Sequence, residues 1–426
     1  MLLSFSVANF KSFREEQVLD LTASALQPAF SWLENAIVPV GKGDNALRVK
    51  ALYGANASGK SNLIKALYAM LSISLLSAKT PGMLPSNVHP YAFAAGNSAE
   101  PSSFELVFVA DSKRYRYGFS ATQQAIVKEW LYDETVRKAK VFERVGQSAS
   151  IGRKYFDNPE SVDILERGDN ELFREDASFL SALALFNVGK VVKDVTSFLS
   201  GITIFGDVEK ISVEQNAYKL LAHEGVRDKV LELLRFAGIE FKELFVVDKK
   251  TLEGQGIPPV HLKELQSTKG RLSLVVSHKW GDAENEISGW LVEKSESQGT
   301  QKLLVMAPYI VQTILQGRIL IIDEFEAKLH TRLSREIVSM FNSSTGNPNN
   351  AQFIFSTHDT NLLDHRLLRR DQIDFVEKGK DRASIIYSLA DIKGIRKDSD
   401  FELDYLGGSY GAVPDVTDFN IAILED

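Results

Sequence analysis

Residues 54–61 form the segment of the chain whose residue types and spacing most directly suggest chemistry. The sequence there is GANASGKS, followed by Asn62, and it fits the pattern G-x-x-x-x-G-K-[ST]. In this pattern, backbone N–H groups at a helix N-terminus hold the β- and γ-phosphates of a nucleotide. Lys60 would add a positive charge there, and the Ser61 hydroxyl would ligate Mg²⁺. The segment therefore predicts a phosphate cradle; a glycine turn that only precedes Lys-Ser is the alternative.

Asp323 and Glu324 end the apolar run ILII and form a second candidate set. Four consecutive apolar residues predict a buried strand, which delivers both carboxylates to the carboxyl edge of an α/β sheet, where ligands bind. Asp323 would hold Mg²⁺ through water, and Glu324 would orient and deprotonate an attacking water. For such a run taken alone, an acidic cap on a buried strand is the commoner interpretation. This interpretation is less favoured when a phosphate loop is also present in the chain.

Two further signals are weak when each is taken alone. His358 follows the apolar segment QFIFST and could contact the γ-phosphate from a neighbouring strand end. Ser297 and Gly299 open a predicted helix, whose N-terminus would be another anion site. Because one loop already supplies a cradle, a second anion site indicates a phosphate bound between two subunits. The alternatives are an unremarkable histidine and a simple helix cap.

The flanking sequence has the patterns of the elements that must position these residues. Residues 47–53 read as a strand that runs into the glycine loop, and residues 60–76 carry apolar side chains at helical spacing. This strand–loop–helix order is the context that a phosphate loop requires. Later in the chain, helices and strands alternate at residues 300–315, 318–324, 329–341 and 352–359. Pro308 lies inside the first of these helices, where it is expected to kink or break it.

We expect three parts along the chain. Residues 1–150 hold the phosphate loop and a β-rich block, with strands at residues 2–10, 17–23, 103–110, 114–121 and 125–134. Residues 151–270 read as a mainly helical insertion, without the sustained heptads of a coiled coil. Residues 271–426 hold the Ser-x-Gly helix, the Asp-Glu strand, the histidine and two late strands before an acidic, glycine-rich tail.

Composition limits the function further. The chain has 426 residues, 44% of them hydrophobic, and a formal net charge of −7. Nucleic acid is therefore expected to contact only local basic clusters such as RKAK at residues 137–140 or LLRRD at residues 367–371. The absence of cysteine excludes disulfides, thiolate metal sites and cysteine nucleophiles, and it suits a reducing cytoplasm. No secretory signal or membrane-spanning run is recognised, so a cytoplasmic protein is expected.

Taken in chain order, the phosphate loop, the Ser-x-Gly helix, the Asp-Glu strand and the strand histidine resemble the ATP-binding-cassette (ABC) ATPases. ANASGKSN and FSVANFKSF resemble their SMC, RecF and Rad50-like branch. The whole chain resembles a narrower group, the RloA-like ATPases of bacterial abortive-infection systems, which are relatives of the OLD-family and PARIS ATPases. The motifs that carry this resemblance are FSVANFKSFREE, RYRYGF with IVKEWLY, GTQKLLVMAPYI, FSTHDTNLLD and YLGGSYGAVP.

The resemblance implies an α/β fold: an ABC-type ATPase head with a central mixed or parallel sheet, an N-terminal antiparallel β subdomain and a helical insertion. It implies ATP and Mg²⁺ as cofactors, with Asp323 and Ser61 at the metal and Glu324 and His358 as catalytic residues. ATP is expected to contact the phosphate loop and two basic residues after the first strand: Gly54, Asn56, Gly59, Lys60, Ser61, Asn62, Lys11 and Arg14. A solvated hairpin is the other interpretation of Lys11 and Arg14.

Ser297 and Gly299 are implied to complete the site of the partner subunit in a homodimer or a higher homo-oligomer. A bulky side chain at Gly299 is then expected to damage the partner's site and not its own. Residues 325–330 occupy the place of the loop by which such dimers communicate. The glutamine that couples Mg²⁺ to the insertion in this family is not identifiable, because no glutamine occurs between Ser61 and Gln123. Either Gln123 or Gln124 takes this role, or the role is absent. His89-Pro90-Tyr91 is another candidate for the place of this glutamine in the chain.

Several functions are compatible with these features. The leading hypothesis is a dimeric switch ATPase of an anti-phage system that controls a partner effector, a nuclease such as a Toprim-type enzyme encoded nearby. The alternative is a RecF- or Rad50-like DNA-repair ATPase that acts on DNA directly. Nuclease activity in this chain is rejected, because its late Asp398-x-Asp400 does not follow a buried strand. A scaffold that binds ATP without hydrolysing it is disfavoured by Glu324.

Overall fold

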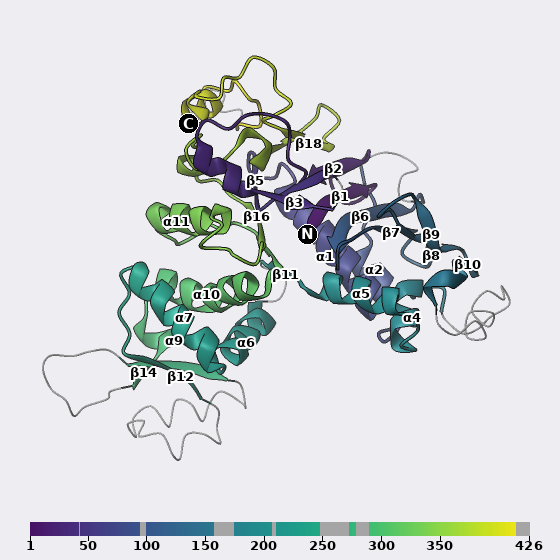
Figure 1. Cartoon of the computed structure of the whole chain (residues 1–426), viewed down its shortest axis with the longest axis horizontal. Coiled ribbons are helices and arrows are strands. Elements are labelled where there is room, and N and C mark those ends of the chain that lie inside the picture. Colours follow the sequence, from purple (N-terminus) through teal and green to yellow (C-terminus); the bar gives the residue numbers. More distant parts are fainter. Residues whose placement is uncertain are drawn as a thin grey trace, which may run out of the picture. The chain divides into compact units, whose positions relative to one another are not determined.

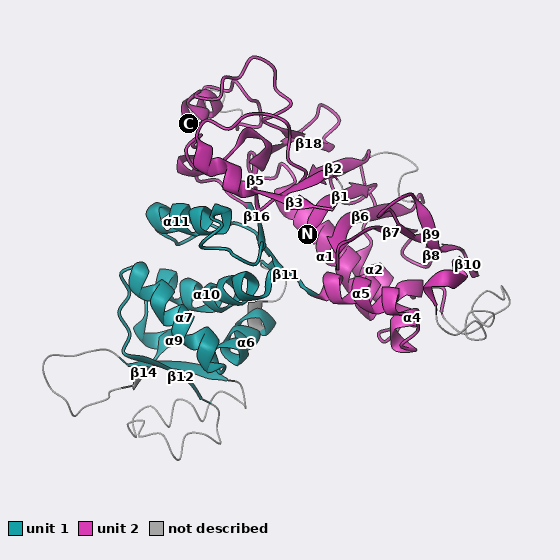
Figure 2. Cartoon of the chain, viewed as in Figure 1, with its two compact units in different colours: residues 1, 201–355 teal, residues 2–200, 356–426 magenta. Residues whose placement is uncertain are grey.

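The computed structural model describes residues 1–41, 43–93, 99–156, 174–206, 210–247, 272–277 and 289–414. The chain forms two compact units, which Figure 2 shows in different colours. Unit 1 consists of Met1 and Gly201–Phe355, and unit 2 of Leu2–Ser200 and Ser356–Asp426. The boundary expected near residue 270 lies outside the described residues, and the predicted three-part division stays a prediction.

Unit 2 contains a seven-stranded antiparallel sheet with the strand order β10-β9-β8-β7-β6-β1-β2. Its strands alternate buried and exposed side chains; in β7, for example, Tyr115, Tyr117 and Phe119 are buried on one face. The strands are β1 Leu2–Ala8, β2 Gln17–Asp20, β6 Ser102–Ala110, β7 Lys113–Ala121, β8 Ile126–Asp133, β9 Ala139–Val145 and β10 Ser148–Ile151. The prediction of an N-terminal antiparallel β subdomain is confirmed.

A second group of strands in unit 2 carries the phosphate loop. β5 (Val49–Tyr53) pairs in parallel with β17 (Ile373–Lys378), and β17 pairs antiparallel with β18 (Ser384–Ser388), so the sheet is mixed. All five residues of β5 are buried. The remaining described elements of unit 2 are β3 Ile37–Val40, β4 Asp44–Leu47, α1 Lys60–Leu76, α2 Met83–Asn87, α4 Phe179–Leu185, α5 Lys190–Ser200, α12 Phe401–Leu406 and short 3-10 turns at Ser31–Ala36, Arg153–Tyr155, Thr360–Leu362 and Arg370–Gln372.

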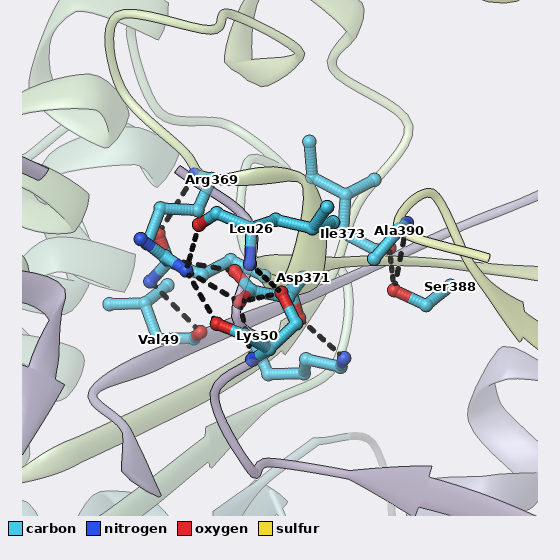
Figure 3. Close-up of polar contacts among 10 residues, drawn as sticks. Leu26, Val49, Lys50, Arg369, Asp371, Ile373, Ser388 and Ala390 are labelled. Carbon is cyan, nitrogen blue, oxygen red and sulfur yellow. Dashed lines mark hydrogen bonds and ion pairs between the residues drawn. The ribbon is translucent and has the colours of Figure 1, made fainter. Parts of the chain in front are cut away.

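Buried charges brace the first half of β5, the strand that leads to the phosphate loop (Figure 3). The Lys50 ammonium lies 2.6 Å from an Asp374 carboxylate oxygen and donates to the Asp371 carbonyl oxygen at 2.8 Å. Arg369 binds both carboxylate oxygens of Asp371, at 2.9 and 2.8 Å. Burial outweighs the attraction of Lys50 and raises the pKa of Asp374 to about 6. These contacts tie β5 to β17 and to the turn before it.

Unit 1 contains three parallel strands in the order β11-β15-β16, covered by helices. Figure 1 shows α6, α7 and α10 packed beside one another, with β12 and β14 close to α9. The strands are β11 Ile202–Phe205, β15 Ile319–Ile322, β16 Gln352–Ser356 and the antiparallel set β12 Glu243–Val247, β13 Ser273–Ser277 and β14 Gly289–Leu291. The helices are α6 Lys210–Leu221, α7 Glu224–Phe236, α9 Val292–Ser295, α10 Gln298–Gln316 and α11 Thr331–Asn342.

The α/β fold class is confirmed, with two local differences from the sequence-based expectations. Pro308 was expected to kink or break its helix; α10 continues through it as one helix, so it does not break there, and the kink stays a prediction. The residues around this proline, Met306 to Val311, are buried, and their packing supports the helix on both sides of it. The middle of the chain is also less purely helical than expected, because it contributes β11 to the parallel strands.

Candidate functional site

The glycines of the phosphate loop are required by the packing around them in unit 2. The loop leaves β5 after Tyr53, and α1 begins at Lys60. Gly54 has a φ angle of 147° and Gly59 one of 125°, which other residues rarely adopt. A Cβ atom at Gly54 would collide with the carbonyl oxygen of Val376, and one at Gly59 with the hydroxyl of Ser384. The loop therefore needs glycine at both positions of the motif.

The interior of this loop suits a phosphate group. Lys60 is buried, and its ammonium donates to the carbonyl oxygens of Gly54 at 2.7 Å and of Ala55 at 3.1 Å. The first N–H groups of α1 have no acceptor within their own helix and point out of its N-terminus. Within the described part of the chain, the buried hydroxyl of Ser58 has no hydrogen-bond partner. A positive charge and several donors therefore converge where the motif predicts the β- and γ-phosphates.

The remaining loop residues show how α1 is anchored. Asn56 is exposed in the loop, and Ser61 is half-buried at the start of α1. Asn62 donates from its side-chain amide to the hydroxyl of Ser12 at 2.9 Å. The Ser12 carbonyl oxygen in turn accepts from the N–H of Ser384 at 2.7 Å. Ser12 and Ser384 therefore support the loop from two distant segments, and no pattern in the sequence indicated either of them.

Lys11 and Arg14 lie in the turn that follows β1, close to α1. Burial, together with the nearby Lys65, lowers the pKa of the Lys11 ammonium. Lys11 also has a φ angle of 48°, and its N–H donates to the carbonyl oxygen of His89 at 2.7 Å. Arg14 lies 3.6 Å from Asp381 and 3.5 Å from Glu15. Lys11 is thus placed beside the helix of the phosphate loop, whereas Arg14 is engaged by carboxylates.

His358 leaves β16 beside the strand that carries the phosphate loop. The N–H of Thr357 donates to the carbonyl oxygen of Leu52 in β5 at 3.1 Å, and the hydroxyl of Tyr53 donates to the Asp359 carbonyl oxygen at 3.3 Å. His358 itself is exposed. His358 therefore follows a segment that contacts the carboxyl end of β5, from which the loop departs, and its role towards the γ-phosphate stays a prediction.

Gln123, one candidate for the coupling glutamine, has a contact within unit 2. It follows β7, and its side-chain amide donates to the carbonyl oxygen of Val88 at 3.1 Å. This bond links the turn between β7 and β8 to the segment that holds His89. The role of Gln123 or Gln124 towards Mg²⁺ stays a prediction.

Asp323 and Glu324 follow β15 in unit 1, whose four residues are all buried. The N–H of Asp323 donates to the carbonyl oxygen of Phe205, at the end of β11, at 3.0 Å. Glu324 is exposed and has a φ angle of 51°, a strained conformation for a residue with a side chain. Both residues line a cavity of about 440 Å³, together with Gln298, Gln301, Lys302, Lys328 and residues of β11 and α6.

Gln298, the middle residue of the Ser-x-Gly segment, lines this same cavity. Ser297 is the N-cap of α10, and its hydroxyl accepts from the N–H of Thr300 at 3.2 Å. A Cβ atom at Gly299 would lie 2.6 Å from the carbonyl oxygen of Lys328 in the same chain. The expectation that a bulky side chain at Gly299 would spare its own subunit is therefore wrong. Gln298, by contrast, is exposed at the first position of α10.

Two residues of this segment have roles that the motif alone did not indicate. The side-chain amide of Gln301 donates to the carbonyl oxygens of Val292, Glu293 and Glu296, at 3.3, 3.2 and 2.8 Å, and so joins α9 to α10. The Lys302 ammonium donates to the carbonyl oxygen of Glu324 at 2.9 Å. Their only signal in the sequence was their place directly after Ser-x-Gly.

The predicted site residues therefore form two groups, one in each unit. Unit 2 holds the phosphate loop, Lys11 and Arg14 near the start of α1, and His358 beside β5. Unit 1 holds Asp323 and Glu324 at its cavity, which Gln298, the residue between Ser297 and Gly299, also lines.

A protein-family model described as "AAA domain, putative AbiEii toxin, Type IV TA system" matches residues 50–184 and 197–364. The chain belongs to this AAA-domain family. The match includes the phosphate loop, the Ser-x-Gly helix, the Asp-Glu strand and His358. Membership of an ATPase family implies nucleotide binding with a divalent metal, which agrees with the charge and the donors of the phosphate loop.

Three similar solved structures are SMC head domains. The first is "Crystal structure of the SmcHead bound to the C-winged helix domain of ScpA", with 14% identity, a TM-score of 0.44, and coverage of 91% of this chain and 97% of that chain. The second is the SMC head domain from Thermotoga maritima, with 14% identity, a TM-score of 0.39, and coverage of 91% of this chain and 98% of that chain. The third is the Smc head domain with an extended coiled coil bound to the C-terminal domain of ScpA, derived from Pyrococcus furiosus, with 15% identity, a TM-score of 0.37, and coverage of 91% of this chain and 96% of that chain. None of the curated proteins matches the chain. No described helix is both long and apolar enough to cross a membrane.

Proposed function

We propose that this chain is an ATP hydrolase that acts as a dimeric switch in a bacterial anti-phage, abortive-infection system. The observation that carries the hydrolase assignment is the phosphate loop, whose two glycines are required by packing and whose buried Lys60 ammonium donates to the loop carbonyl oxygen of Gly54. Family membership supports the same conclusion, because the matched residues include the loop and the Asp-Glu strand.

Each residue would have a separate task in hydrolysis. Lys60 and the N–H groups at the start of α1 would hold the β- and γ-phosphates. Ser61 and Asp323 would hold Mg²⁺, which supplies positive charge to the phosphate oxygens when it is bound. Glu324 would accept the proton of the attacking water, and His358 would donate a hydrogen bond to the γ-phosphate. Lys11 would add positive charge near the phosphates.

The dimer is proposed from the N-terminus of α10. This helix has 19 residues; Ser297 and Gln298 at its N-terminus are exposed, and the half-buried Gly299 follows them. Such an N-terminus favours an anion because its N–H groups and its dipole point outward. We propose that it binds the γ-phosphate that the partner subunit's loop holds. Two ATP molecules would then join two subunits, and hydrolysis would release them.

The link to defence comes from the sequence resemblance to RloA-like, OLD-family and PARIS ATPases, and the toxin–antitoxin description of the family is compatible with it. The ATP-bound dimer would control a separate effector, a nuclease of the Toprim type encoded nearby. The late Asp-x-Asp of this chain has a structural task, because Asp400 caps α12 by accepting from the N–H of Leu403 at 3.0 Å. We therefore place the nuclease in the partner protein.

Glu324→Gln tests the hydrolase mechanism, because the amide keeps the size of the side chain and loses the base. The variant should bind Mg²⁺-ATP with nearly unchanged affinity and accumulate as a dimer with ATP. Its rate of phosphate release should be lower than that of the wild-type protein by a factor of about 100 or more. Phosphate release, calorimetry and light scattering measure these three properties. Hydrolysis at the wild-type rate would show that another group is the base, and an absence of hydrolysis in the wild-type protein would refute the assignment as a whole.

A further inference from the structure

Lys302 connects the helix of the Ser-x-Gly segment to the backbone of the proposed base. It lies in the second turn of α10, half-buried. Its ammonium donates to the carbonyl oxygen of Glu324 at 2.9 Å and reaches that of Phe325 at 3.3 Å. A charged donor shared between two consecutive carbonyl oxygens fixes the orientation of the peptide group between them.

The peptide that Lys302 holds belongs to a segment with unusual backbone geometry. Glu324 and Lys328 both have positive φ angles, 51° and 67°. Residues with side chains adopt this region at a cost and keep it only where their surroundings enforce it. Besides Lys302, the Glu324 carbonyl oxygen accepts from the N–H of Ala327 at 3.1 Å. Lys302 is thus one of the groups that enforce the strained conformation of Glu324.

The other side of the same segment is anchored in the core of unit 1. Phe325 is fully buried, and its ring centroid lies 5.0 Å from that of Phe353 and 5.2 Å from that of Phe355. The backbone at Glu324 is therefore held between a hydrophobic anchor against β16 and an ammonium on α10. The hydrophobic anchor belongs to the strands, whereas the ammonium moves with α10.

We propose that Lys302 is a positioning residue for Glu324 and that it makes the orientation of this carboxylate depend on the position of α10. The inference rests on the proposed function, in which Glu324 is the base and the first turn of α10 binds the partner's phosphate. A shift of α10 when that phosphate binds would act on the Glu324 peptide through Lys302. Lys302 itself has no contact with substrate in this account.

The test compares Lys302→Met, which keeps the length of the side chain and loses the ammonium, with Lys302→Arg, which keeps a charged donor. A hydrogen bond from a charged donor corresponds to a factor of about 10 to 100 in rate, so kcat of Lys302→Met should fall by that factor. The Kd for Mg²⁺-ATP should change less than about threefold, because the phosphate loop is untouched. Lys302→Arg should recover most of kcat.

Hydrogen–deuterium exchange supplies a readout that does not depend on hydrolysis. Amides of residues 323–329 should exchange faster in Lys302→Met than in the wild-type protein, because one of the restraints on Glu324 is lost. Lys219→Met is the matched control: Lys219 lies on α6 in the same unit, is exposed, and donates to the side-chain oxygen of Asn216 at 3.4 Å. It should change neither the exchange rate nor kcat.

Each outcome decides between the two proposals. Unchanged exchange and a kcat within about threefold of wild type for Lys302→Met would overturn the positioning role while leaving the ATPase assignment intact. Equal losses in Lys302→Met and Lys302→Arg, with a matching fall in the melting temperature, would reduce Lys302 to a packing role and overturn the proposal as well. If the wild-type protein does not hydrolyse ATP, the proposed function fails, and the exchange measurement alone then decides whether Lys302 restrains Glu324.

Discussion

Gly299→Ala tests whether α10 and the loop after Glu324 are packed as tightly as the structure indicates. The new methyl group would lie 2.6 Å from the carbonyl oxygen of Lys328, whereas ordinary contacts begin at 3.4 Å. The helix or the loop must therefore move by about 0.8 Å. Lys328 has little freedom to yield, because its φ angle is already 67° and Lys302 holds the same loop near Glu324.

Two magnitudes follow from this displacement. Overpacking of this kind lowers the free energy of unfolding by about 1 to 3 kcal/mol, partly offset by the gain of about 0.5 to 1 kcal/mol from replacing glycine within a helix. A misplacement of a catalytic group by about 1 Å reduces the rate up to about 100-fold. We therefore expect a modest loss of stability and a 10- to 100-fold loss of kcat in phosphate release.

Gly225→Ala is the matched control for this experiment. Gly225 is the second residue of α7, as Gly299 is of α10, but a Cβ atom at Gly225 meets nothing within 4 Å. This variant should gain about 0.5 to 1 kcal/mol in urea denaturation and keep its rate. Gly299→Ala with wild-type stability and rate, beside a control that behaves as expected, would refute the packing argument.

The buried charges beside β5 give two further predictions. Lys50→Met should lower the free energy of unfolding by about 3 to 5 kcal/mol in chemical denaturation, because Asp374 loses its buried cation. The double variant Lys50→Met/Asp374→Leu should recover most of this loss. Equal stability of Lys50→Met and wild type would contradict the ion pair. Because the folded-state pKa of Asp374 is raised from 3.8 to about 6, the stability of wild type relative to Asp374→Asn should be greatest below pH 3.8 and should fall as the pH rises through 6, by up to about 3 kcal/mol. A pH-independent difference between the two proteins would show that Asp374 titrates normally.

The local elements were predictable because their patterns are set by neighbouring residues. Helix α1 begins at Lys60 and ends at Leu76, as the spacing of its apolar residues predicted. The strands β6, β7 and β8 also lie where their alternating side chains indicated. Such periodicities depend only on whether one face of an element is buried, and this information is present in the local sequence.

The contacts between distant segments were not predictable from the sequence. Ser12 and Ser384 support the phosphate loop from positions nearly the whole chain apart, and a serine in a loop carries no signal of such a contact. Lys302 was visible in the sequence only by its place after the Ser-x-Gly segment, and its bond to the Glu324 carbonyl depends on how α10 packs against β15. The close approach of the Lys328 carbonyl oxygen to Gly299 in the same chain was not predictable either, because a glycine at a helix N-terminus does not reveal which backbone segment approaches it.

The central claim is that ATP lies between the phosphate loop of one subunit and α10 of the other, and a mixing experiment tests it most directly. The two lesions are Lys60→Ala, in the loop, and Gln298→Glu, which places a negative charge on the exposed first residue of α10 without touching the contact of Gly299 with Lys328. Both are made in the Glu324→Gln background, so that retained ATP can be counted without hydrolysis. Each variant carries a different tag, and heterodimers formed with Mg²⁺-ATP are isolated through both tags.

Each double variant alone should retain no ATP, because both of its composite sites carry a lesion. The heterodimer collects both lesions in one site and leaves the other intact, so it should retain about one ATP, against about two for the Glu324→Gln dimer. If no heterodimer is recovered through the two tags, or if it carries no ATP, the shared site between subunits is contradicted.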